Sequence, residues 1–142
     1  MGELRRAVEL RTADYMADWL SARLDPSSLF QSTGRAYVQF AQEEPELFKL
    51  FALRRREGVS SLEELRQKEA SPKVAQAIAA QLGLSMEQAR RLHLDMLIYT
   101  VGLGTIFSVT MPGIPAQEVF ARQERAYQAF LKQAKEEPGH EE

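Results

Sequence analysis

The apolar residues of this chain recur at steps of three and four, which is the period of an α-helix, and the alternation typical of a strand is nearly absent. In the first segment, Leu4, Val8, Tyr15 and Trp19 share one face, and a neighbouring face carries further apolar side chains as far as Leu24. Continued along the chain, the pattern predicts an all-α fold of six to seven helices.

Capping and breaking residues divide the first half of the chain into helices. Asp25 and Pro26 predict a stop and a new start, since aspartate caps free amides and proline suits the first turn of a helix. A second helix is therefore expected from about Ser27 to Glu43. Pro45 begins a third, mostly apolar helix, which we expect to lie inside the fold and to end at Gly58.

The second half shows the same signals more strongly. Ser61 and Glu64 have the spacing of a capping box and predict a short exposed helix over residues 61–69. A helix opened by Ser71 and Pro72 is expected to close at Gly83. A second capping box, Ser85 and Gln88, begins the longest helix, which we expect to reach about Thr110. Pro112 and Pro115 precede a last helix over residues 116–136.

The longest helix is apolar around its whole circumference after Asp95. No residue from Met96 to Met111 is charged, but this run is shorter than the ~20 residues needed to span a bilayer, so we interpret it as a buried helix with no role in a membrane. Such a helix must be covered on every side. It has more apolar surface than one small domain covers easily, which favours pairing with another chain.

Composition narrows the function classes. The length of 142 residues predicts one domain, with a disordered tail at 138–142. The absence of cysteine excludes disulfides and thiolate zinc sites, and fits a cytoplasmic location. A net charge of −2 with interleaved signs gives no basic surface, so this chain alone is not expected to bind DNA.

Residues with catalytic chemistry are few. His93 and His140 are the only histidines, so a metal site would need several carboxylates as well, and no metal or cofactor is predicted. His93 fits a histidine satisfied by its helical neighbours better than a ligand for a polar group. Gly102 and Gly104 lie inside a helical run, so they do not form a nucleotide loop and instead predict close packing or space for a ligand. No nucleophile, acid and base are brought together, so an enzyme is not expected.

Aromatic residues supply the candidate binding site. Each is ordinary core material individually, but domains that bind apolar compounds line their cavities with such residues and a few hydroxyls. Arg54, Arg55 and Arg56 are bracketed by glutamates and predict a solvated helix end. The candidate ligand-binding residues are Tyr15, Trp19, Tyr37, Phe40, Phe48, Phe51, Met96, Tyr99 and Thr100, with the hydroxyls of Tyr37, Tyr99 and Thr100 as polar handles.

Two stretches resemble the regulatory half of TetR and AcrR transcriptional repressors. RAYVQFAQEEPELFKLF, from Arg35 to Phe51, is similar to a family segment in which one helix ends in "FA" and the next starts with "P-x-L-F". LIYTVGLGTIF, from Leu97 to Phe107, is similar to the place where several members carry a His-Gly pair, although Val101 precedes Gly102 here. The resemblance extends over residues 4–135.

This resemblance implies an effector-binding and dimerisation domain. A small apolar effector would enter a helical pocket under the first helix, and a homodimer would form through a four-helix bundle built from the last two long helices of each copy. The candidate dimer-interface residues are Leu103, Ile106, Phe107, Phe120, Tyr127, Phe130 and Leu131.

The chain departs from the family in one respect, because this sequence contains no counterpart of the N-terminal helix-turn-helix that reads operator DNA. The alternatives are a trimmed piece of a longer regulator, a reading frame whose start is misplaced, and a regulator that naturally lacks the DNA-reading segment. A second hypothesis is an interaction module that forms a heterodimer with a full-length relative and requires no ligand.

Overall fold

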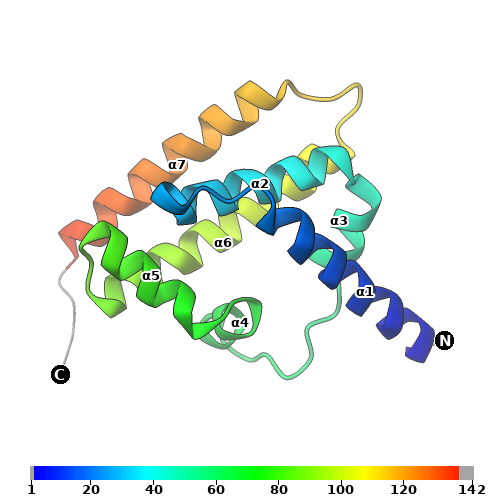
Figure 1. The fold of residues 1–142 in the computed structure, drawn as a ribbon, viewed down its shortest axis with the longest axis horizontal. Helices are drawn as coiled ribbons and strands as arrows, with labels where there is room; N and C mark the ends of the chain where they lie inside the picture. Colours follow the sequence, from blue (N-terminus) through cyan, green and yellow to red (C-terminus); the bar gives the residue numbers. More distant parts are fainter. Residues whose placement is uncertain (1, 138–142) are drawn as a thin grey trace. The chain divides into compact units, whose positions relative to one another are not determined.

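The computed structural model describes residues 2–137, which are mostly helical and contain no strand. Seven α-helices and one short 3₁₀ turn follow one another along the chain (Figure 1). Their bounds are α1 Gly2–Ser21, η1 Pro26–Ser28, α2 Leu29–Glu43, α3 Pro45–Ala52, α4 Leu62–Glu69, α5 Pro72–Leu82, α6 Met86–Val109 and α7 Ala116–Glu136. The all-α class is therefore confirmed.

The predicted capping residues begin and end the helices of the second half. The Ser61 hydroxyl accepts a hydrogen bond from the Glu64 amide at 3.1 Å at the start of α4. At the start of α6 the capping box is complete, because the Gln88 amide donates to the Ser85 hydroxyl at 3.1 Å and the Ser85 amide donates to Gln88 Oε1 at 2.9 Å. Gly83 ends α5 with a φ of 67°, the left-handed conformation that favours glycine.

Two boundaries in the first half differ from the sequence prediction. The residues at 26–28 form a separate 3₁₀ turn capped by Asp25, so α2 begins at Leu29 rather than Ser27. The expected third helix does not reach Gly58, because α3 ends at Ala52. There the Arg54 guanidinium donates to the Phe51 carbonyl at 2.7 Å and satisfies one of the last carbonyls of the helix with a side chain.

The chain divides into two compact units. The first contains residues up to 55 and residues 100–123, and the second contains residues 56–99 and 124 onwards. The first unit therefore holds α1, η1, α2 and α3 with the C-terminal part of α6 and the N-terminal part of α7. The second holds α4 and α5 with the remaining parts of α6 and α7.

The first unit is built around two apolar clusters. The larger one, which we call the aromatic cluster, has Met16, Phe40, Ala41, Phe48 and Ala52 at its buried centre. Partly buried side chains from α1, α2, α3 and α6 pack around this centre: Trp19, Leu20, Tyr37, Leu47, Phe51 and Val101. The second cluster joins Val38 of α2 to Phe107 of α6 and Val119 of α7. Helices α1, α2 and α3 contact one another pairwise, so α1 covers the aromatic cluster.

In the second unit the end of α7 is joined to the beginning of α6 by polar contacts. Gln88 Nε2 donates to the Glu137 carbonyl at 2.9 Å, and the Arg91 guanidinium lies 2.9 Å from the Glu137 carboxylate. Tyr99 and Phe130 stack edge to face with ring centroids 6.2 Å apart. The tail predicted to be disordered, 138–142, lies outside the described residues, as does His140.

Helix α6 is long and apolar enough to cross a membrane, by length and composition alone. One third of its most apolar 18-residue window is buried. A single helix of this kind is a weak signal, because the core helix of a soluble protein passes the same test.

Candidate functional site

Five of the nine candidate ligand-binding residues lie together in the aromatic cluster, and Tyr15 contacts the cluster from its exposed edge. Trp19 of α1 meets Phe40 of α2 edge to face at a centroid distance of 5.2 Å, and Tyr15 meets the same ring at 6.0 Å. Tyr37 of α2 and Phe48 of α3 form a second edge-to-face pair at 5.2 Å. Edge-to-face pairs direct the positive ring edge at the negative face of the neighbouring ring, and these pairs join rings of α1, α2 and α3 within the aromatic cluster.

The other three candidates lie on α6. Thr100 is buried in the first unit, whereas Met96 and Tyr99 belong to the second unit. Phe51 is the fifth candidate in the aromatic cluster and packs against its buried centre.

Charged groups border the aromatic cluster. The Arg23 guanidinium lies over the Trp19 ring at 3.4 Å, and the Arg54 guanidinium lies over the Phe51 ring at 4.0 Å. The Tyr15 hydroxyl donates a 2.8 Å hydrogen bond to Glu44 Oε2. This hydrogen bond, helped by desolvation and by the negative charge of Glu44, raises the pKa of Tyr15. The cluster is thus apolar inside and polar at its rim, as in sites for amphipathic small molecules.

A glycine of α6, Gly104, lets a ring of the aromatic cluster pack directly against the backbone of α6. A Cβ placed on Gly104 would lie 2.6 Å from Cζ of Phe48, closer than side chains tolerate. The end of the Phe48 ring therefore rests on the bare backbone of α6. This arrangement explains one of the two glycines that the sequence marked as a place of close packing.

Gln123 is a buried polar residue that the sequence analysis missed. Its side chain is only 4% exposed, and neither Oε1 nor Nε2 has a hydrogen-bond partner among residues 2–137. The amide lies against α2, where a Cβ on Gly34 would be 3.0 Å from Nε2. The signal that could have revealed it is spacing, because Val119, Gln123 and Tyr127 follow at steps of four on the buried face of α7.

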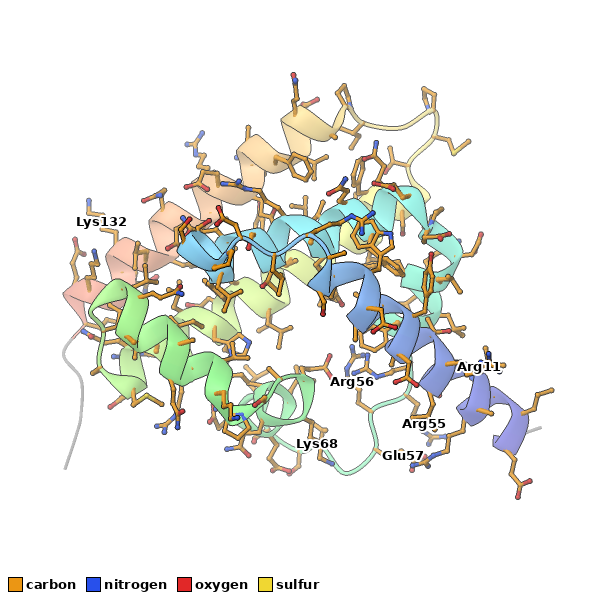
Figure 2. The ribbon with its side chains drawn as sticks, viewed as in Figure 1. Arg11, Arg55, Arg56, Glu57, Lys68 and Lys132 are labelled. Atoms are coloured by element: carbon orange, nitrogen blue, oxygen red, sulfur yellow. The ribbon has the colours of Figure 1, made fainter. Side chains whose placement is uncertain are left out.

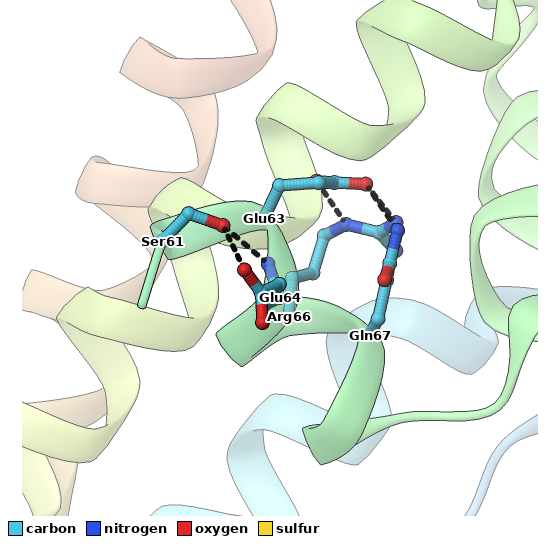
Figure 3. A network of polar contacts seen from close by, with 5 residues as sticks. All are labelled: Ser61, Glu63, Glu64, Arg66 and Gln67. Carbon is cyan, nitrogen blue, oxygen red and sulfur yellow. Dashed lines mark hydrogen bonds and ion pairs between the residues drawn. The ribbon is translucent and has the colours of Figure 1, made fainter. Parts of the chain in front are cut away.

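A network of charged side chains lies on α4 in the second unit. Arg66 is buried and donates two hydrogen bonds to the Glu63 carboxylate, from Nε at 2.9 Å and from a terminal nitrogen at 2.6 Å (Figure 3). This fork lowers the pKa of Glu63. Buried His93 of α6 has a pKa lowered from 6.5 to about 4, first by burial and then by the positive charge of Arg66.

The arginine run after α3 is held by structural contacts. Arg56 pairs with the buried Glu69 carboxylate at 3.1 Å. Lys68 reaches back from α4 to donate to the Glu57 carbonyl at 3.1 Å, and both of these residues are labelled in Figure 2. These contacts fasten the segment between α3 and α4 to α4. They account for Arg56 without a bound anion.

The predicted dimer-interface residues fall into two groups. Phe107 and Tyr127 are 6% and 3% exposed, so they pack within the chain and leave almost no surface for a partner. Ile106 is 59% exposed. The remaining residues are partly buried: Leu103, Phe120, Phe130 and Leu131.

One side of α6 is left exposed, and we call it the outer face. It contains Ile98, Ile106 and Val109, which are 48%, 59% and 56% exposed, together with Gly102. A Cβ placed on Gly102 would meet nothing within 4 Å. The sequence indicated that this helix is apolar all round but could not show which side the chain itself covers.

Within residues 2–137, no three His, Cys, Asp or Glu side chains are placed to hold a metal ion.

Comparisons with known proteins give no relative. No protein-family model matches the chain, and neither a curated protein nor a solved structure matches it. The TetR resemblance therefore rests on the two quoted stretches.

Proposed function

We propose that this chain is the effector-binding and dimerisation domain of a TetR-type transcriptional regulator that senses a small apolar molecule. The observation that carries the proposal is the aromatic cluster of the first unit. Rings from α1, α2 and α3 meet there, with hydroxyl and charged groups at the rim. This is the combination of apolar body and few polar contacts that an amphipathic ligand requires.

The attachment of α1 suggests how binding is transmitted. Its buried residues are Thr12 and Met16, and Trp19 and Leu20 pack on the aromatic cluster, so its C-terminal half holds it to the unit. Residues 2–8 are exposed on every side. A ligand that separates Trp19 from Phe40 displaces the anchored half, and the projecting half amplifies that movement as a lever. In a regulator with DNA-reading segments, this movement would change their separation and release the operator.

The sole tryptophan provides a direct test, because Trp19 lies in the aromatic cluster. We expect 1-naphthol, an aromatic body with one hydroxyl, to change the Trp19 fluorescence in a saturable way and to raise the thermal midpoint in parallel. Two matched variants locate the site: Phe51→Leu in the aromatic cluster is expected to weaken binding, and Phe107→Leu in the second cluster is expected to preserve it.

Two results would reject the ligand-binding part of this proposal. One is the absence of any saturable response to 1-naphthol and to a panel of apolar compounds of different size. The other is an equal loss of binding in both variants, since a general loss of stability, and not a site, would then explain the response.

A second candidate function is an interaction module that pairs with a different chain and needs no ligand. The observation that favours it is the outer face of α6, because its exposed apolar side chains would be buried by a partner whether or not the aromatic cluster binds a ligand. Mixing the tagged chain with a full-length TetR-type regulator from the same source separates the two candidates. Formation of a mixed dimer supports the second, and exclusive self-pairing removes it.

A further inference from the structure

Gln123 of α7 carries a hydrogen-bond donor and an acceptor that its own chain leaves unused. The residue is 4% exposed, and neither Oε1 nor Nε2 has a hydrogen-bond partner among residues 2–137. Buried polar groups in folded proteins are almost always paired, because an unpaired group loses its hydration and gains nothing in return. A methionine would fill the same length without this cost. The stability of the fold therefore does not explain the amide.

Gly34 of α2 carries a second cost beside the same amide. It lies within a helix, where glycine is less favourable than alanine because the unfolded chain gains freedom. A Cβ on Gly34 would lie 3.0 Å from Gln123 Nε2, which is closer than most side chains pack. The glycine thus lets the amide lie directly against α2. Two positions on two helices both reduce stability and both serve the placement of one amide, which is the pattern expected of a functional site.

The surroundings of the amide indicate which kind of molecule it recognises. One helical turn from Gln123 and Gly34 lie Val119 and Val38, which pack with Phe107 in the second cluster. The buried side chains of this cluster carry no charge, and burying an ion without an opposite charge is very costly, so a neutral ligand is favoured. A carboxamide both donates and accepts, so Oε1 and Nε2 are satisfied together by a second amide with its N–H and carbonyl oxygen side by side.

We propose that Gln123 is the recognition residue of a second binding site, between α2 and α7, for a small neutral molecule with a primary carboxamide or a lactam on an apolar body. The N–H of the ligand donates to Gln123 Oε1, and its carbonyl oxygen accepts from Gln123 Nε2. The apolar body contacts the second cluster. Gln123 is not part of the aromatic cluster, so this site goes beyond the proposed function and holds or fails independently of it.

Calorimetric titration of the full chain with benzamide tests the site. Acetophenone is the matched probe, because it keeps the ring and the carbonyl group and lacks the N–H donors. We expect saturable binding of benzamide and roughly tenfold or weaker binding of acetophenone, since Oε1 then stays unpaired. In the NMR spectrum of the isotopically labelled chain, the side-chain amide signals of Gln123 are expected to shift as benzamide binds. Absence of saturable benzamide binding would overturn the proposal.

Matched variants locate the site. Gln123→Met keeps the length of the side chain and removes both polar atoms, so benzamide affinity is expected to fall roughly tenfold or more. The thermal midpoint without ligand is expected to rise by a few degrees, because an unpaired buried amide is lost. Gln133→Met changes an exposed glutamine of the same helix and is expected to alter neither quantity.

Gly34→Ala tests the site from α2 and keeps the test decisive if Gln123→Met does not fold. The added Cβ displaces the amide from α2, so benzamide binding is expected to weaken. Equal benzamide affinity in the wild type and in both variants would place the binding elsewhere and overturn the proposal. A lower thermal midpoint in Gln123→Met, with no benzamide binding to the wild type, would assign the amide to an internal water that serves the fold. Neither result bears on 1-naphthol, which Phe51→Leu and Phe107→Leu test separately.

Discussion

The two sides of α6 have similar composition and opposite surroundings. The inner side, with Leu92, Met96 and Phe107, is buried, whereas Ile98, Ile106 and Val109 on the outer face are about half exposed. Two glycines two residues apart show the difference most clearly. A methyl group on Gly104 would collide with Phe48, and one on Gly102 would meet nothing. The neighbouring side chains, and not the residue type alone, therefore determine how a substitution at a position on this helix affects packing.

The largest contrast is expected from removing a side chain on each side. Phe48→Ala empties the space above Gly104 and is expected to destabilise the fold by about 3–5 kcal/mol, because Phe48 is fully buried. Ile106→Ala removes an exposed side chain and is expected to change the stability of the monomer by less than about 0.5 kcal/mol. Urea unfolding at low protein concentration measures both. Equal effects would show that the two sides are not distinct.

The pH dependence of stability tests burial on the inner side through His93. Its folded pKa of about 4 lies below the unfolded value of 6.5, so the unfolded chain takes up a proton first as the pH falls. Stability is fully present above about pH 6.5 and is lost as the pH falls towards 4, by about 3 kcal/mol in total. Urea unfolding between pH 7 and pH 4.5 measures the slope. His93→Gln removes the titrating group and should flatten it, and an unchanged slope in this variant would assign the effect elsewhere.

Gly104→Ala tests the close approach of Phe48 to α6. The added methyl group is expected to destabilise the fold by about 1–3 kcal/mol through overpacking. The cost should fall in a Phe48→Leu background, where the ring that causes the collision is absent. A double-mutant cycle measures this coupling, and independent effects of the two changes would contradict the contact.

Gly102→Ala is expected to have the smallest effect and the opposite sign. In the monomer its methyl group enters open space, so the gain in helix propensity should stabilise the fold by about 0.5–1 kcal/mol. The measurement is made in the Ile106→Glu background, because a carboxylate on the outer face of α6 is expected to keep the chain monomeric. Destabilisation there would mean that Gly102 already packs against its own chain.

The helices could be predicted from sequence wherever local chemistry determines them. The ends of α5 and α7 and the starts of α4 and α6 follow from Ser, Pro and Gly at defined positions, and these bounds match the expectation closely. The end of α3 could not be predicted, because the Arg54 side chain, and not Gly58, satisfies its last turn. The 3₁₀ turn at 26–28 was missed because Pro and Ser are equally compatible with the first turn of an α-helix.

The sequence predicted which types of residue would form the candidate site, but it did not predict which of them contact one another. Five aromatic candidates from three helices do come together, because amphipathic helices must bury their rings in one place. The sequence could not separate Phe107 and Tyr127, which pack inside, from Ile106, which is exposed. All three side chains lie in apolar patterns of helical period, so the sequence alone does not show which of them is covered. Only the position of the neighbouring helices distinguishes them. Gln123 was overlooked because a polar side chain is ordinarily expected at the surface. Its burial becomes visible only once its amide is seen to lie against Gly34 of α2.

The central claim is that the outer face of α6 is covered by a second copy of this chain. Sedimentation equilibrium of the wild-type chain beside Ile106→Glu tests it most directly. The wild-type chain is expected to sediment at twice the chain mass of 16.1 kDa, and the variant at the single mass under the same conditions. A wild-type chain that sediments at the single mass up to high concentration, or a variant that remains dimeric, would contradict it.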